Sequence, residues 1–196
     1  MQLSRFFLPL VAALLLGLAG CSPNDSKTAA ASAPAKRDVS VEVVAAQAKG
    51  FTVGSMMSTT TVYVFFDTQC PHCGHLWQAS LPLHRRAKFV WIPIGMISAS
   101  SKTQGSALLT ATDPVALMTE HEALLLAGKG GIAASSSVSS EIESAIQANT
   151  QLFNSFGAEA VPFVVAKNAR TGQTVSRAAA MDTATLAGFV GIDATP

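Results

Sequence analysis

A run of strand-forming residues ends directly before two cysteines that are separated by two residues. The run covers residues 61–66, the motif is Cys70-Pro71-His72-Cys73, and a segment with helical spacing begins at Pro71. Proline is tolerated in the first turn of a helix because the N–H that it lacks would have no partner there. The pattern therefore predicts a buried strand, a tight turn and a helix that begins at the cysteine pair.

The position of Cys70 at the start of this helix favours its thiolate. Unpaired backbone N–H groups and the positive end of the helix dipole face the sulfur there. Cys73 lies about one turn further on and can attack a mixed disulfide formed at Cys70. We therefore predict a redox-active disulfide in which Cys70 is the nucleophile and Cys73 the resolving cysteine. Pro71 and His72 belong to this catalytic motif, and His72 is expected to stabilise the thiolate by charge or by a hydrogen bond.

The N-terminal segment, residues 1–20, has the pattern of a secretory signal peptide. One basic residue precedes an apolar run at residues 6–18 that is too short to cross a bilayer comfortably. Residues 18–21, Leu-Ala-Gly-Cys, resemble the lipobox of bacterial lipoproteins. The resemblance implies cleavage before Cys21 and lipid attachment to Cys21. Ser22 follows, which by the usual sorting rule favours the outer membrane over the inner membrane.

Composition limits the remaining possibilities. The chain has 13 Lys+Arg and 12 Asp+Glu, and no basic patch suggests a nucleic-acid partner. Residues 21–38 have almost no large apolar side chains and predict a flexible tether. Residues 39–196 are enough for one domain. With Cys21 lipidated, Cys70 and Cys73 would be the remaining thiols, in an exported compartment that permits disulfides.

The apolar pattern along residues 39–196 alternates between strand and helix. Asp113 is predicted to cap one helix, Ser140 and Glu143 to form the capping box of another, and Asp182 to cap the last. Pro82 should end or kink the helix that begins at Pro71. The predicted strands are edge strands at 41–44 and 51–53, buried strands at 61–66 and 88–94, and a hairpin at 161–166 and 173–177; helices dominate residues 103–156.

This order of elements resembles the thioredoxin fold, an α/β fold, with a helical insertion between the C-x-x-C helix and the strand at the cis-proline. Residues 62–73, with Trp77 four residues after the second cysteine, resemble the catalytic domain of the DsbC/DsbG family, and Asp67 matches that family. The Pro-His dipeptide is the one found in DsbA. The resemblance implies that Pro162 is cis, faces the cysteine pair and, with Val161, binds the substrate chain as an added strand.

Departures from the family point away from an isomerase. Threonine precedes the family's cis-proline, whereas Val161 stands here, as in DsbA. The chain between the tether and residue 61 is short for the N-terminal dimerisation domain of DsbC and DsbG, so we expect a monomer. Thioredoxin also has a buried acid six residues ahead of its first cysteine, where this chain has Val64. Asp67 is nearer in sequence, but the sequence identifies no proton acceptor for Cys73.

These features predict a periplasmic thiol:disulfide oxidoreductase that is lipid-anchored to the envelope, needs no cofactor or metal, and acts as an oxidant on exported proteins. A membrane redox partner would regenerate it. One alternative is a dedicated reductase that such a partner keeps reduced. Another is a metal-binding lipoprotein in which His72 and His75 join the cysteines. No second C-x-x-C closes such a site, and Gly74 after Cys73 excludes c-type haem attachment.

Overall fold

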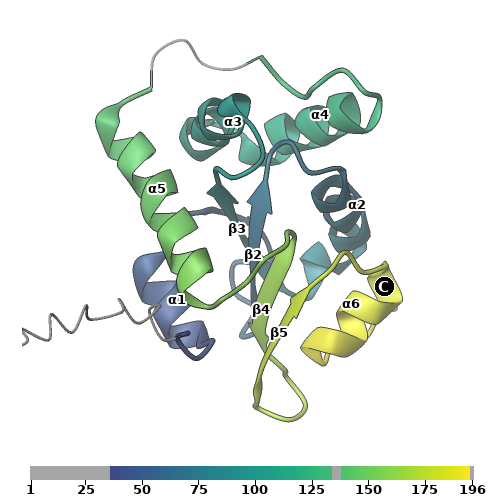
Figure 1. The fold of residues 1–196 in the computed structure, drawn as a ribbon. Helices are drawn as coiled ribbons and strands as arrows, with labels where there is room; N and C mark the ends of the chain where they lie inside the picture. The colour runs from purple at the N-terminus through teal and green to yellow at the C-terminus, as the bar shows by residue number, and fades with distance from the viewer. Residues whose placement is uncertain (1–35, 134–137, 195–196) are drawn as a thin grey trace, which may run out of the picture. The chain divides into compact units, whose positions relative to one another are not determined.

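A five-stranded mixed sheet forms the centre of the computed structural model, which describes residues 36–133 and 138–194 (Figure 1). In chain order the elements are α1 (Val41–Gln47), β1 (Phe51–Gly54), β2 (Thr61–Asp67), α2 (Pro71–Ser80), the 3₁₀ helix η1 (Leu81–Arg85), β3 (Lys88–Ile94), α3 (Ala99–Thr110), α4 (Pro114–Leu126), α5 (Ser140–Ser155), β4 (Phe163–Lys167), β5 (Thr174–Ala178) and α6 (Thr183–Val190).

The strands lie in the order β1-β3-β2-β4-β5. The central pair, β2 and β3, is parallel, and the other neighbouring pairs are antiparallel. The helices α3, α4 and α5 lie between β3 and β4 in the chain. This arrangement confirms the predicted α/β thioredoxin-like fold with a helical insertion before the strand that follows Pro162.

Side chains of the central strand pack against helices on both faces of the sheet, because successive residues of a strand point to opposite sides. Val64 and Phe66 belong to the core that includes Trp77 of α2, together with residues of α4 and α6. Phe65 points to the other face, where its ring centroid lies 6.0 Å from that of Phe153 of α5. Figure 1 shows α1 and α5 on one side of the sheet and α2 and α6 on the other.

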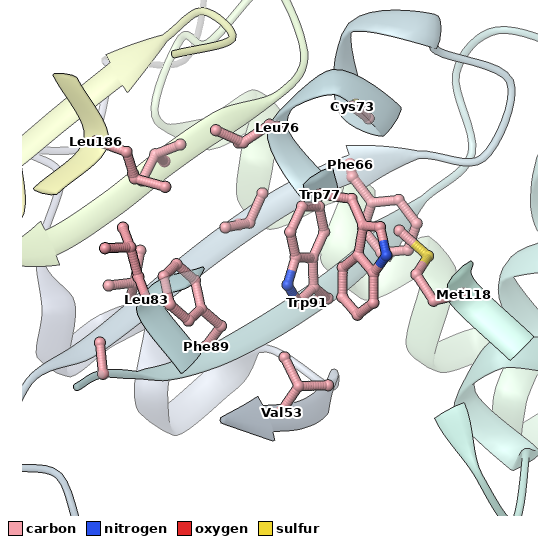
Figure 2. Close-up of a cluster of buried hydrophobic side chains, with 14 of the residues drawn as sticks. Val53, Phe66, Cys73, Leu76, Trp77, Leu83, Phe89, Trp91, Met118 and Leu186 are labelled. Carbon is pink, nitrogen blue, oxygen red and sulfur yellow. The ribbon is translucent and has the colours of Figure 1, made fainter. Parts of the chain in front are cut away.

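The core under the cysteine helix is rich in aromatic rings. Trp77 is 1% exposed and packs edge to face on Trp91 of β3, with ring centroids 5.2 Å apart (Figure 2). Phe66 packs in the same way against Trp91, at 5.4 Å. Trp77 therefore fixes the helix on the sheet through its ring, as a core residue rather than a reactive group.

Several predicted helix boundaries are confirmed. Cys70 is the N-cap of α2 and Pro71 its first residue, and α2 ends before Pro82. Asp113 and Asp182 cap α4 and α6, and each carboxylate accepts a hydrogen bond from a backbone N–H three residues on. Such caps satisfy donors that have no partner within the helix.

Residues 41–44, predicted as an edge strand, instead form the start of α1. Ser40 is the N-cap, and its hydroxyl accepts a hydrogen bond from the N–H of Val43. Val44 is the buried residue of this helix and packs in the core on the α5 face of the sheet. The valine content suggested a strand, but the cap and burial of one helical face outweigh that propensity.

The predicted capping box of Ser140 and Glu143 at α5 is wrong, because the helix begins one residue earlier and Ile142 stands at the third helical position. Ser139 is the N-cap, and its hydroxyl accepts a hydrogen bond from the N–H of Ile142, while Ser140 is the first helical residue. Consecutive serines offer two possible caps, and local sequence alone does not choose between them.

The predicted signal peptide, Cys21 and all but the last residues of the predicted tether lie outside the described residues. Residues 36–38 form neither helix nor strand. Within the described ranges, no helix has the length and apolar character that crossing a membrane requires.

Candidate active site

The two cysteines lie where β2 ends and α2 begins. The backbone N–H of Cys70 donates to the carbonyl of Asp67 at 3.0 Å, which forms the turn between strand and helix. Both cysteines are free thiols, with Cys70 5% exposed and Cys73 fully buried. Of the two sulfurs, Cys70 is thus the one within reach of another molecule.

The surroundings separate the acidities of the two thiols. A hydrogen bond from the Cys73 thiol, followed by backbone N–H groups of Cys73 and His72, lowers the pKa of Cys70 to about 6, and the charge of His72 adds the smallest part. Burial opposes this shift. For Cys73, burial and its hydrogen bond to Cys70 raise the pKa well above its ordinary value. A thiolate is therefore favoured at Cys70 over Cys73.

The loop before β4 brings Val161 and Pro162 to the cysteine pair. The Val161–Pro162 peptide bond is cis, as the resemblance implied. The Cys70 thiol donates to the carbonyl oxygen of Val161 at 3.5 Å, although the two residues lie 91 positions apart in sequence. The backbone that precedes β4 therefore lies directly beside the more exposed sulfur.

Asp67, whose side chain could not be placed from sequence, is fully buried and accepts four hydrogen bonds. One carboxylate oxygen accepts from the N–H groups of Met96 and Ile97, at 2.7 and 3.0 Å. The other accepts from the N–H of Gln69 and the hydroxyl of Ser101, at 2.9 and 2.6 Å. Asp67 therefore ties the active-site turn to the loop after β3, and its acceptor capacity is already used.

The helical insertion holds the turn from its other side. His121 of α4 is fully buried, and its Nδ1 accepts from the N–H of Ile132 at 3.2 Å. Its Nε2 therefore carries the proton and donates to the Thr68 carbonyl at 2.7 Å. The Gln69 amide donates to Gln104 of α3 at 2.6 Å. Both residues between Asp67 and Cys70 are thus held by the insertion.

Glu122 is the site residue that the sequence did not identify. It lies on α4, next to His121, and is 1% exposed. A Cβ atom on Gly74, the residue after Cys73, would overlap its Oε2. The only signal in the sequence is an acid within the spacing Met118, Glu122, Leu125, which places all three on one face of a helix.

The histidines of α2 lie at the surface. Both His72 and His75 are exposed, with ring centroids 6.2 Å apart. No group of three or more His, Cys, Asp or Glu side chains within the described ranges is arranged to hold a metal ion.

Sequence comparison relates the chain to thiol:disulfide interchange proteins. No protein-family model matches it. It is 30% identical to DsbG of Pseudomonas aeruginosa over 111 residues, which cover 55% of this chain and 42% of the relative. It is 27% identical to DsbG of Escherichia coli over 113 residues, covering 57% and 45%. The matched segment thus spans less than half the length of these curated relatives.

Solved structures share the fold at lower sequence identity. The catalytic domain of Proteus mirabilis ScsC matches with a TM-score of 0.59 at 17% identity, over 76% of this chain and 95% of that one. A periplasmic thioredoxin-like protein from Salmonella enterica serovar Typhimurium matches with a TM-score of 0.59 at 16% identity, over 79% and 97%. By sequence, the chain is similar to thiol:disulfide interchange proteins named DsbG, and by structure its described part has a thioredoxin-like fold.

Proposed function

We propose that this chain is a thiol:disulfide oxidoreductase of the cell envelope that exchanges disulfides with exported proteins through Cys70 and Cys73. The observation that carries the proposal is the opposite shift of the two thiol pKa values within one hydrogen-bonded pair. Attack at Cys70 requires a thiolate near neutral pH, and Cys73 is held protonated and out of solvent until a mixed disulfide forms. The names of the relatives support the same reaction class.

Val161 and Pro162 are the proposed contact to the substrate backbone. The Val161 carbonyl lies beside Cys70, and its neighbouring backbone leads into β4. A substrate chain that pairs with this segment as an added strand would bring its own cysteine to the Cys70 sulfur. Met96 and Ile97, which are 44% and 53% exposed, offer apolar surface in the loop that Asp67 anchors.

The depressed pKa of Cys70 favours the oxidant over the reductase. Groups that stabilise the thiolate stabilise the reduced protein relative to the disulfide, which makes the disulfide a stronger oxidant. A membrane partner would then reoxidise the pair. Equilibration of the protein with glutathione buffers tests the direction: a potential well above that of thioredoxin, about −270 mV, supports the oxidant. A potential at or below that of thioredoxin supports the reductase.

The proposed location follows from the sequence features outside the described residues. Cleavage before Cys21 and lipid attachment to Cys21 would anchor the domain through the tether at residues 21–38, with the outer membrane favoured. We propose a monomer because the chain between the tether and residue 61 is short for the dimerisation domain of DsbC and DsbG. Metabolic labelling with palmitate, compared between the full chain and a Cys21→Ser variant, tests the anchor; equal labelling of both would contradict it.

Trapping of substrates tests the assigned roles. With Cys73→Ala in the full chain, a mixed disulfide at Cys70 cannot be resolved internally, so adducts with envelope proteins should accumulate on non-reducing gels. The matched Cys70→Ala variant should form none. Equal trapping by both variants, or by neither, would overturn the proposed roles of the two cysteines.

A further inference from the structure

Glu122 lies on the face of α4 that packs against the cysteine helix. Met118, one turn earlier on the same face, belongs to the core that also holds Cys73 and Trp77. Figure 2 shows the Met118 side chain in this core, with Cys73 on the neighbouring helix. Glu122 continues that face toward the start of α2.

The tip of the Glu122 side chain lies against the residue that follows Cys73. Its Oε2 occupies the space that a Cβ atom on Gly74 would need, and Cγ of Leu126 is 3.3 Å from that position. Gly74 is fully helical and buried, so the absence of a side chain there lets the carboxyl group approach the backbone of α2. The carboxyl group is therefore placed beside the first turn of the cysteine helix.

This carboxyl group has no hydrogen-bond partner among the described residues, although both of its oxygens are buried. An unpaired buried carboxylate is costly, so burial, followed by the charge of Cys70, raises the pKa of Glu122 to about 8. The Glu122 charge is in turn one of the causes that raise the pKa of Cys73. The charge of Cys70 therefore acts on Glu122, and the charge of Glu122 acts on Cys73.

The two cysteines are the titratable groups of the described residues whose charges are coupled to that of Glu122. His121, its neighbour on α4, points to the Thr68 carbonyl. The other titratable side chains on elements around this face are exposed or already engaged: Asp67 of β2, Lys102 of α3, and His72 and His75 of α2. None of them offers a free acceptor beside Cys73.

We propose that Glu122 is the proton acceptor and proton donor for Cys73 during disulfide exchange. The inference rests on the proposed function and extends it, because Val64 of β2 stands where thioredoxin carries its buried acid and Asp67 is fully hydrogen-bonded. The acid that serves Cys73 is thus supplied by the helical insertion instead of the sheet.

When the enzyme dithiol is oxidised, Cys73 loses its proton and closes the disulfide with Cys70. In the mixed disulfide Cys70 carries no charge, and this favours the ionised form of Glu122. The Cys73 thiol gives its proton to this carboxylate, and the Cys73 thiolate attacks the Cys70 sulfur of the mixed disulfide. The Cys70–Cys73 bond forms, the bond from Cys70 to the substrate sulfur breaks, and the substrate leaves as a thiolate. The enzyme loses two electrons and the substrate disulfide gains them.

When the enzyme disulfide is the oxidant, the same groups act in reverse. A substrate thiolate attacks Cys70, and Cys73 leaves and takes the proton of the Glu122 carboxylic acid. A second substrate thiolate then attacks the first substrate sulfur, which closes the substrate disulfide and releases the Cys70 thiolate. The charge of that thiolate favours the protonated form of Glu122 and so resets the acid.

The test follows the two steps separately in the full chain. Reduced protein is mixed with oxidised glutathione, quenched with acid, and analysed by mass spectrometry for dithiol, mixed disulfide and Cys70–Cys73 disulfide across the pH range. Glu122→Gln should slow conversion of the mixed disulfide to the disulfide roughly tenfold to a hundredfold at neutral pH. In this variant, the rate of the second step should instead rise with pH, because solvent then accepts the Cys73 proton. The rate of the first step, formation of the mixed disulfide, should change little.

Matched variants define the result. Glu120→Gln changes an exposed acid on the same helix and should follow the wild type. Glu122→Met, apolar and of similar length, should show the same slow second step as Glu122→Gln. If Glu122 acted only as a nearby negative charge, its removal would lower the Cys73 pKa and speed the second step. A faster or unchanged second step with an unchanged pH profile would therefore overturn the inference. A wild-type protein that forms no mixed disulfide at Cys70 would instead overturn the proposed function.

Discussion

Two buried carboxyl groups lie close to the cysteine pair, and their surroundings differ completely. Asp67 lies at the end of β2 and accepts four hydrogen bonds, two at each oxygen. Glu122 lies on α4 and accepts none from the described residues. The first arrangement supplies donors to both carboxyl oxygens, whereas burial without donors raises the pKa of Glu122 and favours its carboxylic acid. One acid therefore holds the site together, and the other is free to exchange a proton.

The same contrast separates the two thiols. Cys70 receives hydrogen bonds from the Cys73 thiol and from two backbone N–H groups, and its pKa is lowered although it is largely buried. Cys73 is fully buried and donates to Cys70, and its pKa is raised. Hydrogen-bond donors thus outweigh burial at Cys70, whereas burial is the largest cause of the raised pKa at Cys73 and at Glu122.

Asp67→Asn should cause the largest loss of stability. Each Asp67 oxygen accepts two hydrogen bonds, so the amide NH₂ of asparagine must face two donors in either orientation. Losing bonds to a charged group and burying unmatched donors should lower the free energy of unfolding by about 4 kcal/mol. Urea unfolding at neutral pH measures it.

Asp113→Asn is the control for that prediction. Asp113 is an exposed N-cap that accepts one backbone hydrogen bond, a role that asparagine fills equally well. It should change the free energy of unfolding by less than about 0.5 kcal/mol. Equal losses for the two variants would show that the four hydrogen bonds to Asp67 contribute no more to the free energy of unfolding than the single cap hydrogen bond of Asp113.

Glu122→Gln should stabilise the protein, but only at high pH. The pKa of Glu122 is raised from 4.5 to about 8 in the folded protein, so the folded state holds a proton that the unfolded state releases. Stability from this group is complete below its unfolded pKa and is lost as the pH rises through about 8. Glutamine does not titrate, so the variant should gain up to about 5 kcal/mol over wild type between about pH 4 and about pH 9.

This measurement uses the reduced protein, because the charge of Cys70 contributes to the raised pKa of Glu122 and is absent from the disulfide. Urea unfolding of wild type, Glu122→Gln and Glu120→Gln at the two pH values gives the comparison. Glu120 is exposed, and its variant should show no such pH-dependent gain. A pH-independent difference between wild type and Glu122→Gln would mean that Glu122 is not protonated in the folded state.

The sequence predicted the parts of the site that are contiguous in the chain. The strand of residues 61–66, the helix from Pro71 and the cap position of Cys70 follow from local propensity and from the chemistry of helix termini. The cis bond at Pro162 required the family resemblance, because nothing near it in the chain distinguishes it from an ordinary strand-edge proline.

The sequence did not predict the role of the insertion. Glu122 reaches the site because α4 packs against α2 at Gly74, a contact between segments almost fifty residues apart. His121 beside it suggested no known metal motif, and its actual partner is the backbone carbonyl of Thr68. The roles of both residues depend on how the helices pack. Periodicity predicts that this face of α4 is buried, but it does not predict which element covers the face.

Cys73→Ala tests the donors at Cys70. The hydrogen bond from the Cys73 thiol is the largest cause of the lowered Cys70 pKa, so its loss should move that pKa from about 6 toward 9.0, by at least about one unit. The pH dependence of Cys70 alkylation in the reduced protein measures the shift. Cys73→Ser retains an O–H donor and should shift the pKa less than alanine does. Equal shifts for the two variants would exclude this hydrogen bond as the cause.

His72→Ser should have the smallest effect, and it separates donors from charge. The sequence predicted that His72 helps to stabilise the Cys70 thiolate by charge or by a hydrogen bond, whereas in the structure its charge comes last among the causes. Serine keeps the backbone N–H that points to Cys70 and removes the ring, so the Cys70 pKa should rise by no more than about half a unit. When the thiolate is the dominant reduced species, this corresponds to a fall of about 15 mV in reduction potential.

Alkylation of Cys70 and glutathione equilibration, run on the same His72→Ser protein, measure both quantities. His75→Ser, which alters the next exposed histidine on α2, is the control and should move neither. A His72→Ser shift larger than that of Cys73→Ala would mean that charge at the helix start outweighs hydrogen-bond donors. The contrast between Asp67 and Glu122 would then not extend to the cysteines, and the Pro-His dipeptide would itself determine the oxidising strength of the pair.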